Sequence, residues 1–219
     1  MSTAAKLLHA TDGIWKAYNQ HPFVLGIQNG TLDRDKFRYY MIQDYLYLED
    51  YAKTFAVGVA KAKSLSLANL FAKYIAVMNG ELNVHQGYLA KLGVSQEEID
   101  STPRSLDSLS YTSYMLRVAY EEGEAEILAA ILSCAYSYEV IAENMVKNNP
   151  ASLEDPFYGD WIKGYISDDY REENKILLKE LDHITENCSE KQIEHLVHIF
   201  TVCSRYELAF WEMSWTMSN

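Results

Sequence analysis

The stretch from which the fold and the function are best inferred is residues 131–138, ILSCAYSY. It lies in the middle of a predicted helix over residues 124–148 and places Cys134 within an apolar run. Free cysteine often packs like a small hydrophobic residue. Cys134 is therefore either an inert core thiol or a nucleophile, and its helical neighbours Ser137 and Tyr138 do not decide between the two.

Two carboxylates also occupy apolar helix faces. Asp44 falls on the three-and-four spacing of a helix over residues 34–62, and Glu207 falls on the same spacing in the C-terminal helix, four residues after Cys203. Burying an unpaired carboxylate costs on the order of several kcal/mol. Each could simply bond a buried Tyr or Trp, of which the chain has 17 and 4. Two inward carboxylates beside an inward thiol favour a functional site.

The composition is that of one ordinary globular domain, residues 1–219, with 48% hydrophobic and 23% charged residues. The net charge of -12 disfavours binding to nucleic acid or to an anionic membrane, because both carry negative charge. Three widely spaced cysteines without a C-x-x-C motif fit reduced thiols in the cytoplasm. The N-terminus carries no apparent targeting signal, and no continuous apolar run reaches the roughly 18 residues of a membrane span.

The patterning predicts helices and no convincing strand, hence an all-α domain. A connector over residues 19–32 contains Pro22, Gly26 and Gly30, a short turn opens at Ser95, and residues 102–109 and 149–156 are predicted to be irregular. The expected helices cover residues 3–18, 34–62, about 65–92, 111–121, 124–148, 157–166, 168–187 and 189–217.

Three of these helices each present a polar or reactive group beside an aromatic ring. Tyr47 accompanies Asp44, Tyr138 accompanies Cys134, and Phe210 accompanies Glu207. A pocket between helices with aromatic walls and a few convergent polar groups suits a small flat heterocycle. A thiol and two carboxylates also form a workable set for nucleophilic and acid–base catalysis.

Short motifs along almost the entire chain are those of a known family. They are HPFV at 21–24, NGTL at 29–32, QD at 43–44, YTS at 111–113, AEILAA at 125–130 leading to Cys134, and YE at 206–207 followed by FW at 210–211. With these motifs the chain resembles the TenA, or thiaminase II, family of aminopyrimidine hydrolases, in its cysteine-bearing branch. The resemblance implies a haem-oxygenase-like helical bundle.

The resemblance also implies roles for individual residues. Cys134 falls on the family nucleophile, which attacks the carbon bearing the methylene-linked leaving group, and Glu207 falls on the acid–base that protonates this group and activates water. Asp44 falls on the carboxylate that hydrogen-bonds the aminopyrimidine edge. Further matches that contact the substrate, tune the thiol or stack on the ring are Tyr138, Tyr165, Tyr47, Tyr111 and Phe210.

The resemblance implies hydrolysis of 4-amino-5-aminomethyl-2-methylpyrimidine, or of thiamin, to hydroxymethylpyrimidine in thiamin salvage. It implies no organic cofactor and no metal, and it implies a homotetramer.

At two positions the chain departs from the family pattern. The family commonly has Pro immediately before the cysteine and Trp two residues after it, where this chain has Ser133 and Tyr136. We interpret both as packing variation that could reshape the pocket.

Alternative functions come from other classes. A haem enzyme would need a proximal histidine, for which His21 is the candidate, although its place before Pro22 indicates a helix cap. A metal-dependent oxidase would need Glu and His at helical spacing. Glu81/His85 and Glu194/His195/His198 have that spacing, but the second group falls on a predicted solvated face. A non-enzymatic regulatory protein is the third class, and the thiol with two carboxylates argues against it.

Overall fold

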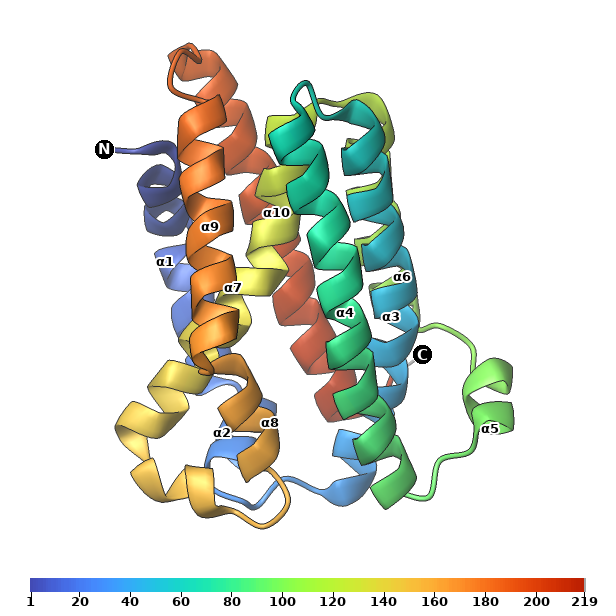
Figure 1. Cartoon of the computed structure of the whole chain (residues 1–219). Helices are drawn as coiled ribbons and strands as arrows, with labels where there is room; N and C mark the ends of the chain where they lie inside the picture. Colours follow the sequence, from blue (N-terminus) through green and yellow to red (C-terminus); the bar gives the residue numbers. More distant parts are fainter. Residues whose placement is uncertain (219) are drawn as a thin grey trace.

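The body of the protein is a bundle of long helices (Figure 1). The computed structural model describes residues 1–218, with the side chains of residues 77 and 79–84 outside the described part. Within it the chain forms helices and no strand, as predicted. The elements are α1 (Thr3–Gln20), α2 (Pro22–Gln28), α3 (Arg34–Lys61), α4 (Leu65–Lys91), α5 (Gln96–Ser101), α6 (Leu106–Glu121), α7 (Glu124–Asn148), the 3-10 helix η1 (Pro150–Glu154), α8 (Gly159–Tyr165), α9 (Asp168–Ile184) and α10 (Glu190–Thr216).

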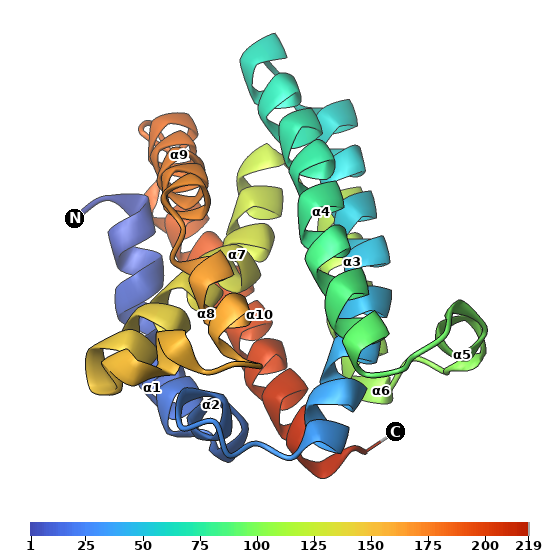
Figure 2. The same cartoon turned by 60° about the horizontal axis from the view of Figure 1, so that its bottom comes forward.

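Helix α7 lies in the middle of the bundle. It packs against α10, α9, α6 and α3, while α3 and α4 form an antiparallel pair on one side and α1 lies against α10 on the other (Figure 2). Residues 127–134 of α7 are all buried, so the stretch around Cys134 is the core of the fold. Helix α5 projects away from the bundle.

Local signals in the sequence account for the helix boundaries. Ser64 and Ser189 cap α4 and α10 by accepting hydrogen bonds from the backbone N–H groups of Leu67 and Gln192. Gly93 follows α4 with φ +69°, a left-handed conformation that glycine adopts at little cost.

The sequence-based boundaries agree with the structure for most of the long helices and differ from it at four segments. The short turn predicted at Ser95 is the helix α5, which Ser95 caps. The connector over residues 19–32 contains α2, which His21 caps and Pro22 begins. Helix α6 begins at Leu106 after the Ser105 cap, so the irregular segment is shorter than predicted. The loop after α7 contains η1. Each of these segments is too short for a periodic pattern to stand out.

Helix α7 is also the one described helix that is long and apolar enough to cross a membrane by length and composition. In the structure 72% of its most apolar window is buried inside the protein. Its apolar character is therefore explained by packing on all sides within the bundle.

Candidate functional site

An inner cavity opens beside Cys134 in the middle of the bundle. It has a volume of about 50 Å³ and its walls come from α3, α4, α7, α8 and α9. Five of the residues predicted from the sequence line it together: Asp44, Tyr47, Cys134, Tyr138 and Tyr165. The remaining predicted site residues, Glu207, Tyr111 and Phe210, lie in the protein interior and do not line it.

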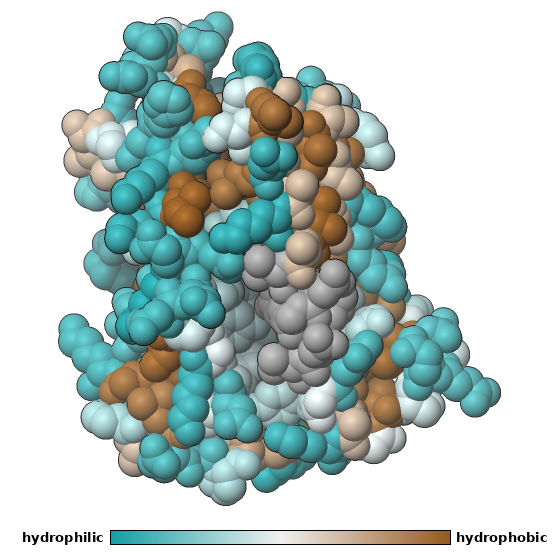
Figure 3. All heavy atoms as spheres, in the orientation of Figure 1, coloured by the Kyte–Doolittle hydropathy of each residue, from teal (hydrophilic) through white to brown (hydrophobic). Residues whose placement is uncertain are grey.

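A larger outer cavity of about 470 Å³ adjoins the inner one. The two share Tyr165, Tyr170 and Glu173, which therefore form the boundary between them. The outer cavity is lined by α3, α4, α8 and α9, and Figure 3 shows the surface hollowed on this face of the molecule. Acidic groups predominate on its wall, where four carboxylates accompany a single lysine: Asp160, Asp169, Glu172, Glu173 and Lys73.

Three tyrosines lie close enough to Cys134 for a charge on its sulfur to affect their pKa values. Tyr47, Tyr111 and Tyr138 are all buried, and their pKa values are raised well above the usual 10, chiefly by burial and further by nearby acidic groups, among them Glu207 and Cys134. They therefore keep their protons near neutral pH and are available as hydrogen-bond donors. Such donors favour the thiolate, which is the nucleophilic form of cysteine.

Glu207 is 1% exposed and does not line the inner cavity, but it lies within hydrogen-bonding reach of Tyr138, which does. Burial, and to a smaller extent the negative charge of Asp44, raises the pKa of its carboxyl from 4.5 to about 8. Hydrogen bonding from Tyr111 and Tyr138 to the ionised form acts in the opposite direction. The carboxyl is therefore mostly protonated at pH 7, which is the state a general acid requires.

Tyr111 and Phe210 pack against Tyr47, one of the residues that line the inner cavity. The Tyr111 ring centroid lies 5.2 Å from that of Tyr47, and the Phe210 ring meets the same tyrosine edge-on at 5.8 Å. Both residues are at most 2% exposed. They contact the cavity wall rather than the cavity space.

His85 was not among the predicted site residues, and the structure places it in the site. Its Nε2 lies 2.6 Å from Oδ2 of Asp44, and both side chains are buried. The Glu81/His85 spacing had marked this histidine, but its observed partner is on another helix, and the Glu81 side chain lies outside the described residues. Only the tertiary pairing of α3 with α4 brings His85 to Asp44.

The two departures from the family pattern differ in kind. Tyr136 packs its ring against Trp15 at a centroid distance of 5.8 Å, in line with packing variation. Ser133 is more than a packing residue, because its Oγ lies 3.1 Å from the Tyr111 hydroxyl. It therefore links helix α7 to one of the tyrosines that lower the pKa of Glu207.

His21 has a structural role in the described chain. Its Nδ1 accepts the backbone N–H of Phe23 at 3.2 Å and so caps α2, as the sequence indicated. Its Nε2 lies 3.0 Å from Oε2 of Glu212 on α10. Both ring nitrogens are thus engaged away from the two cavities.

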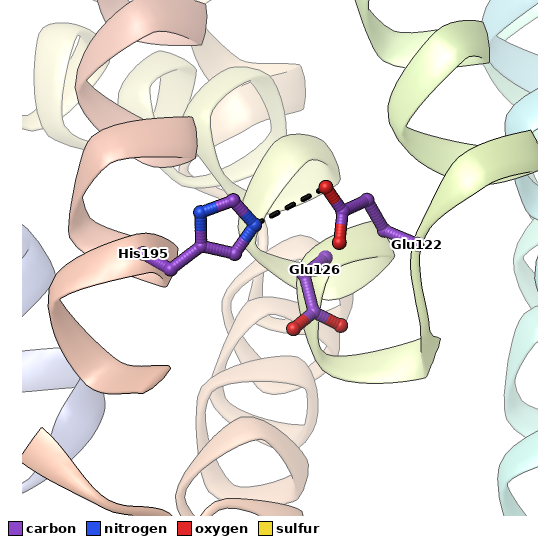
Figure 4. Close-up of side chains that lie close together, drawn as sticks. All are labelled: Glu122, Glu126 and His195. Atoms are coloured by element: carbon purple, nitrogen blue, oxygen red, sulfur yellow. Dashed lines mark hydrogen bonds and ion pairs between the residues drawn. The ribbon is translucent and has the colours of Figure 1, made fainter. Parts of the chain in front are cut away.

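Among the described residues, one group of side chains has the composition of a metal site: Glu122, Glu126 and His195 (Figure 4). It lies at the turn between α6 and α7, facing the first turns of α10, and none of its members lines either cavity. His195 pairs with Glu122 at 3.2 Å, and Glu126 accepts the backbone N–H of Gly123 in a capping interaction. Glu194 and His198 are exposed, as predicted.

Comparison with known proteins covers nearly the whole chain. Residues 8–217 match the TENA/THI-4/PQQC family. A Helicobacter pylori protein named aminopyrimidine aminohydrolase is 42% identical over 216 residues, which is 98% of this chain and 99% of that protein. The solved structure of a TenA homologue protein from P. horikoshii OT3 superposes with a TM-score of 0.89 and 32% identity, covering 99% of both chains.

A more distant structure bears on the fold alone. A domain from Shewanella denitrificans OS217, described as having a heme oxygenase-like fold, superposes with a TM-score of 0.73 at 15% identity and covers 97% of this chain and 92% of that chain. The predicted haem-oxygenase-like helical fold is therefore confirmed.

Proposed function

The chain belongs to the TENA/THI-4/PQQC family, and from this we propose that it is an aminopyrimidine aminohydrolase, or thiaminase II, that uses Cys134 as its nucleophile. The full-length relative with this name supports the hydrolase activity and a small pyrimidine substrate. The observation that carries the catalytic assignment is that Cys134, Asp44 and Tyr138 line one cavity, while the buried Glu207, whose pKa is raised to about 8, interacts with Asp44 and Tyr138.

In the proposed reaction the Cys134 thiolate forms a covalent bond to the pyrimidine substrate, and the amine leaves. Glu207 gives its proton to the departing amine and becomes a carboxylate. That carboxylate then takes a proton from water, whose hydroxyl bonds to the methylene carbon as the bond to sulfur breaks. The thiolate and the protonated Glu207 are restored, so the net change is replacement of the amine by hydroxyl. A thiazolium group, already cationic, leaves without a proton; in that case Glu207 first releases its proton to solvent and then takes one from water.

The walls of the two cavities suit the two parts of such a substrate. Asp44 offers an acceptor to the amino group of the pyrimidine, and the rings of Tyr47, Tyr138 and Tyr165 supply flat apolar contact. The acidic wall of the outer cavity favours a cationic leaving group, whether an ammonium or a thiazolium. Both features support an aminomethylpyrimidine or thiamin as substrate.

The proposal extends to where the enzyme acts and with which partners. We place the enzyme in the cytoplasm as a homotetramer acting in thiamin salvage, without nucleic-acid or membrane partners. The net charge of -12 and the burial of the apolar helix α7 support the last point.

The test is product analysis with purified protein. The parent is mixed with 4-amino-5-aminomethyl-2-methylpyrimidine and, separately, with thiamin, alongside Cys134→Ala. The proposal expects hydroxymethylpyrimidine from at least one substrate with the parent and none above background with the variant. Cys188→Ala is the matched control, because Cys188 lies in the turn before α10 and lines neither cavity, and it should retain the parental rate. Activity that survives in Cys134→Ala would contradict the nucleophile assignment.

A further inference from the structure

A short contact between two buried side chains of the cavity walls joins α3 to α4. His85 Nε2 lies 2.6 Å from Asp44 Oδ2, His85 is 2% exposed and Asp44 is 5% exposed. A hydrogen bond to a charged group is strong and short, and burial protects it from competition with water. The pair therefore fixes the Asp44 carboxylate relative to the helix pair.

The two members face different cavities. Asp44 lines the inner cavity beside Cys134, whereas His85 lines the outer cavity together with Met41, one turn before Asp44 on α3. The imidazole thus approaches the carboxylate from the outer side. The carboxylate remains accessible from the side on which the thiol lies.

The contact with His85 engages one of the two carboxylate oxygens of Asp44. An ionised carboxylate only accepts hydrogen bonds, so Nε2 carries the hydrogen and donates it to Oδ2. Oδ1 has no hydrogen-bond partner among the residues that the structure describes. One carboxylate oxygen is therefore engaged by His85, and the other remains available as an acceptor on a residue that lines the inner cavity.

We propose that His85 is a positioning residue that holds Asp44 so that Oδ1 accepts the 4-amino group of the pyrimidine, and that this pair selects aminopyrimidines over pyrimidines without that group. The inference rests on the proposed function. Nearby hydroxyls do not replace His85, because the Tyr40 hydroxyl donates to that of Tyr138 at 3.4 Å and the Tyr138 hydroxyl bonds Glu207. Without His85 the carboxylate loses its donor, and its plane is no longer fixed.

The experiment compares two substrates across matched variants of the full-length protein. The substrates are 4-amino-5-aminomethyl-2-methylpyrimidine and its analogue without the 4-amino group. His85→Gln retains an N–H donor, whereas His85→Met has nearly the same length and none. We expect the ratio of kcat/KM for the two substrates to fall by about 10- to 100-fold in His85→Met, the usual effect of losing a hydrogen bond to a charged group. His85→Gln should restore much of the ratio.

A double variant separates positioning from a general structural effect. In an Asp44→Asn background, His85→Met should lower the ratio little further, because the carboxylate it positions is already gone. A purely structural role would lower kcat/KM for both substrates equally and leave the ratio unchanged. His85→Phe, which fills the space of the imidazole, takes the place of the methionine variant if that one does not fold. Exposed His195→Met is the control and should behave as the parent.

Different results would overturn the proposed hydrolase function and the role of His85. A parent that hydrolyses neither substrate overturns the proposed function and this inference with it. An active parent whose substrate ratio is the same in His85→Met and in His85→Gln overturns the role of His85 alone.

Discussion

Replacing Glu207 by glutamine gives the sharpest test of the electrostatics of the site. Its carboxyl is 1% exposed, and burial is the largest cause of the rise in its pKa. The native protein therefore holds a proton on Glu207 over a pH range in which the unfolded chain has released it. Glutamine has nearly the same shape and no charge, so the variant lacks this pH-dependent cost.

The size and sign of the effect follow from linkage between protonation and folding. Stability falls with rising pH wherever the native state binds more protons than the unfolded state. For Glu207 that range runs from its ordinary pKa of 4.5 to about 8 in the folded protein. Each unit corresponds to about 1.4 kcal/mol, so the parent should lose up to about 5 kcal/mol of stability across this range because of Glu207. The variant should not show this loss.

The assay is urea unfolding of the parent and Glu207→Gln at several pH values between 5 and 8. We expect the free energy of unfolding of the variant to rise relative to the parent as the pH increases. Glu194→Gln on the exposed face of α10 is the control and should show a nearly constant difference. A difference for Glu207→Gln that is equal at pH 5 and pH 8 would refute the buried, protonated carboxyl. Its hydrolase activity should fall by about 10²- to 10⁴-fold, because an amide cannot transfer the proton.

Three further substitutions or treatments test packing and thiol chemistry. Ser133→Ala removes the 3.1 Å contact with the Tyr111 hydroxyl and should lower the free energy of unfolding by about 0.5–1.5 kcal/mol, measured by urea unfolding at pH 7. Gly159→Ala places a methyl group 2.5 Å from the Leu153 carbonyl oxygen and should destabilise the protein by about 1–3 kcal/mol; an unchanged melting temperature would contradict this close approach. Burial raises the pKa of the Cys203 thiol, so little reactive thiolate forms at pH 8 in the folded protein. An aromatic disulfide reagent at this pH should therefore label Cys203 only after unfolding.

The long helices could be predicted because their signals are local. The helix around Cys134 begins after Gly123 and extends over residues 124–148 both in the prediction and in the structure. Its periodic apolar residues and its boundaries are encoded within the segment itself. The short helix α2 was missed because a segment of seven residues with an internal glycine carries too little pattern.

The site was predictable in its residue types and less so in its layout. Family motifs and helix faces indicated Asp44, Cys134 and Glu207. They did not show that Asp44 and Cys134 line the inner cavity whereas Glu207 does not. Nor did they indicate that Ser133 would bond a tyrosine. Both facts depend on how α6, α7 and α10 pack together.

The sequence by itself determined that this chain is helical, which helix faces turn inward and which acidic and thiol groups lie on them. These properties depend on residues three or four positions apart, so they are present in the linear pattern. The tertiary structure alone decided that His85 reaches Asp44, 41 positions away, and that five of the predicted site residues line one cavity together. Such contacts arise from the packing of distant helices, and burial there sets the proton state of Glu207, a property that no local pattern contains.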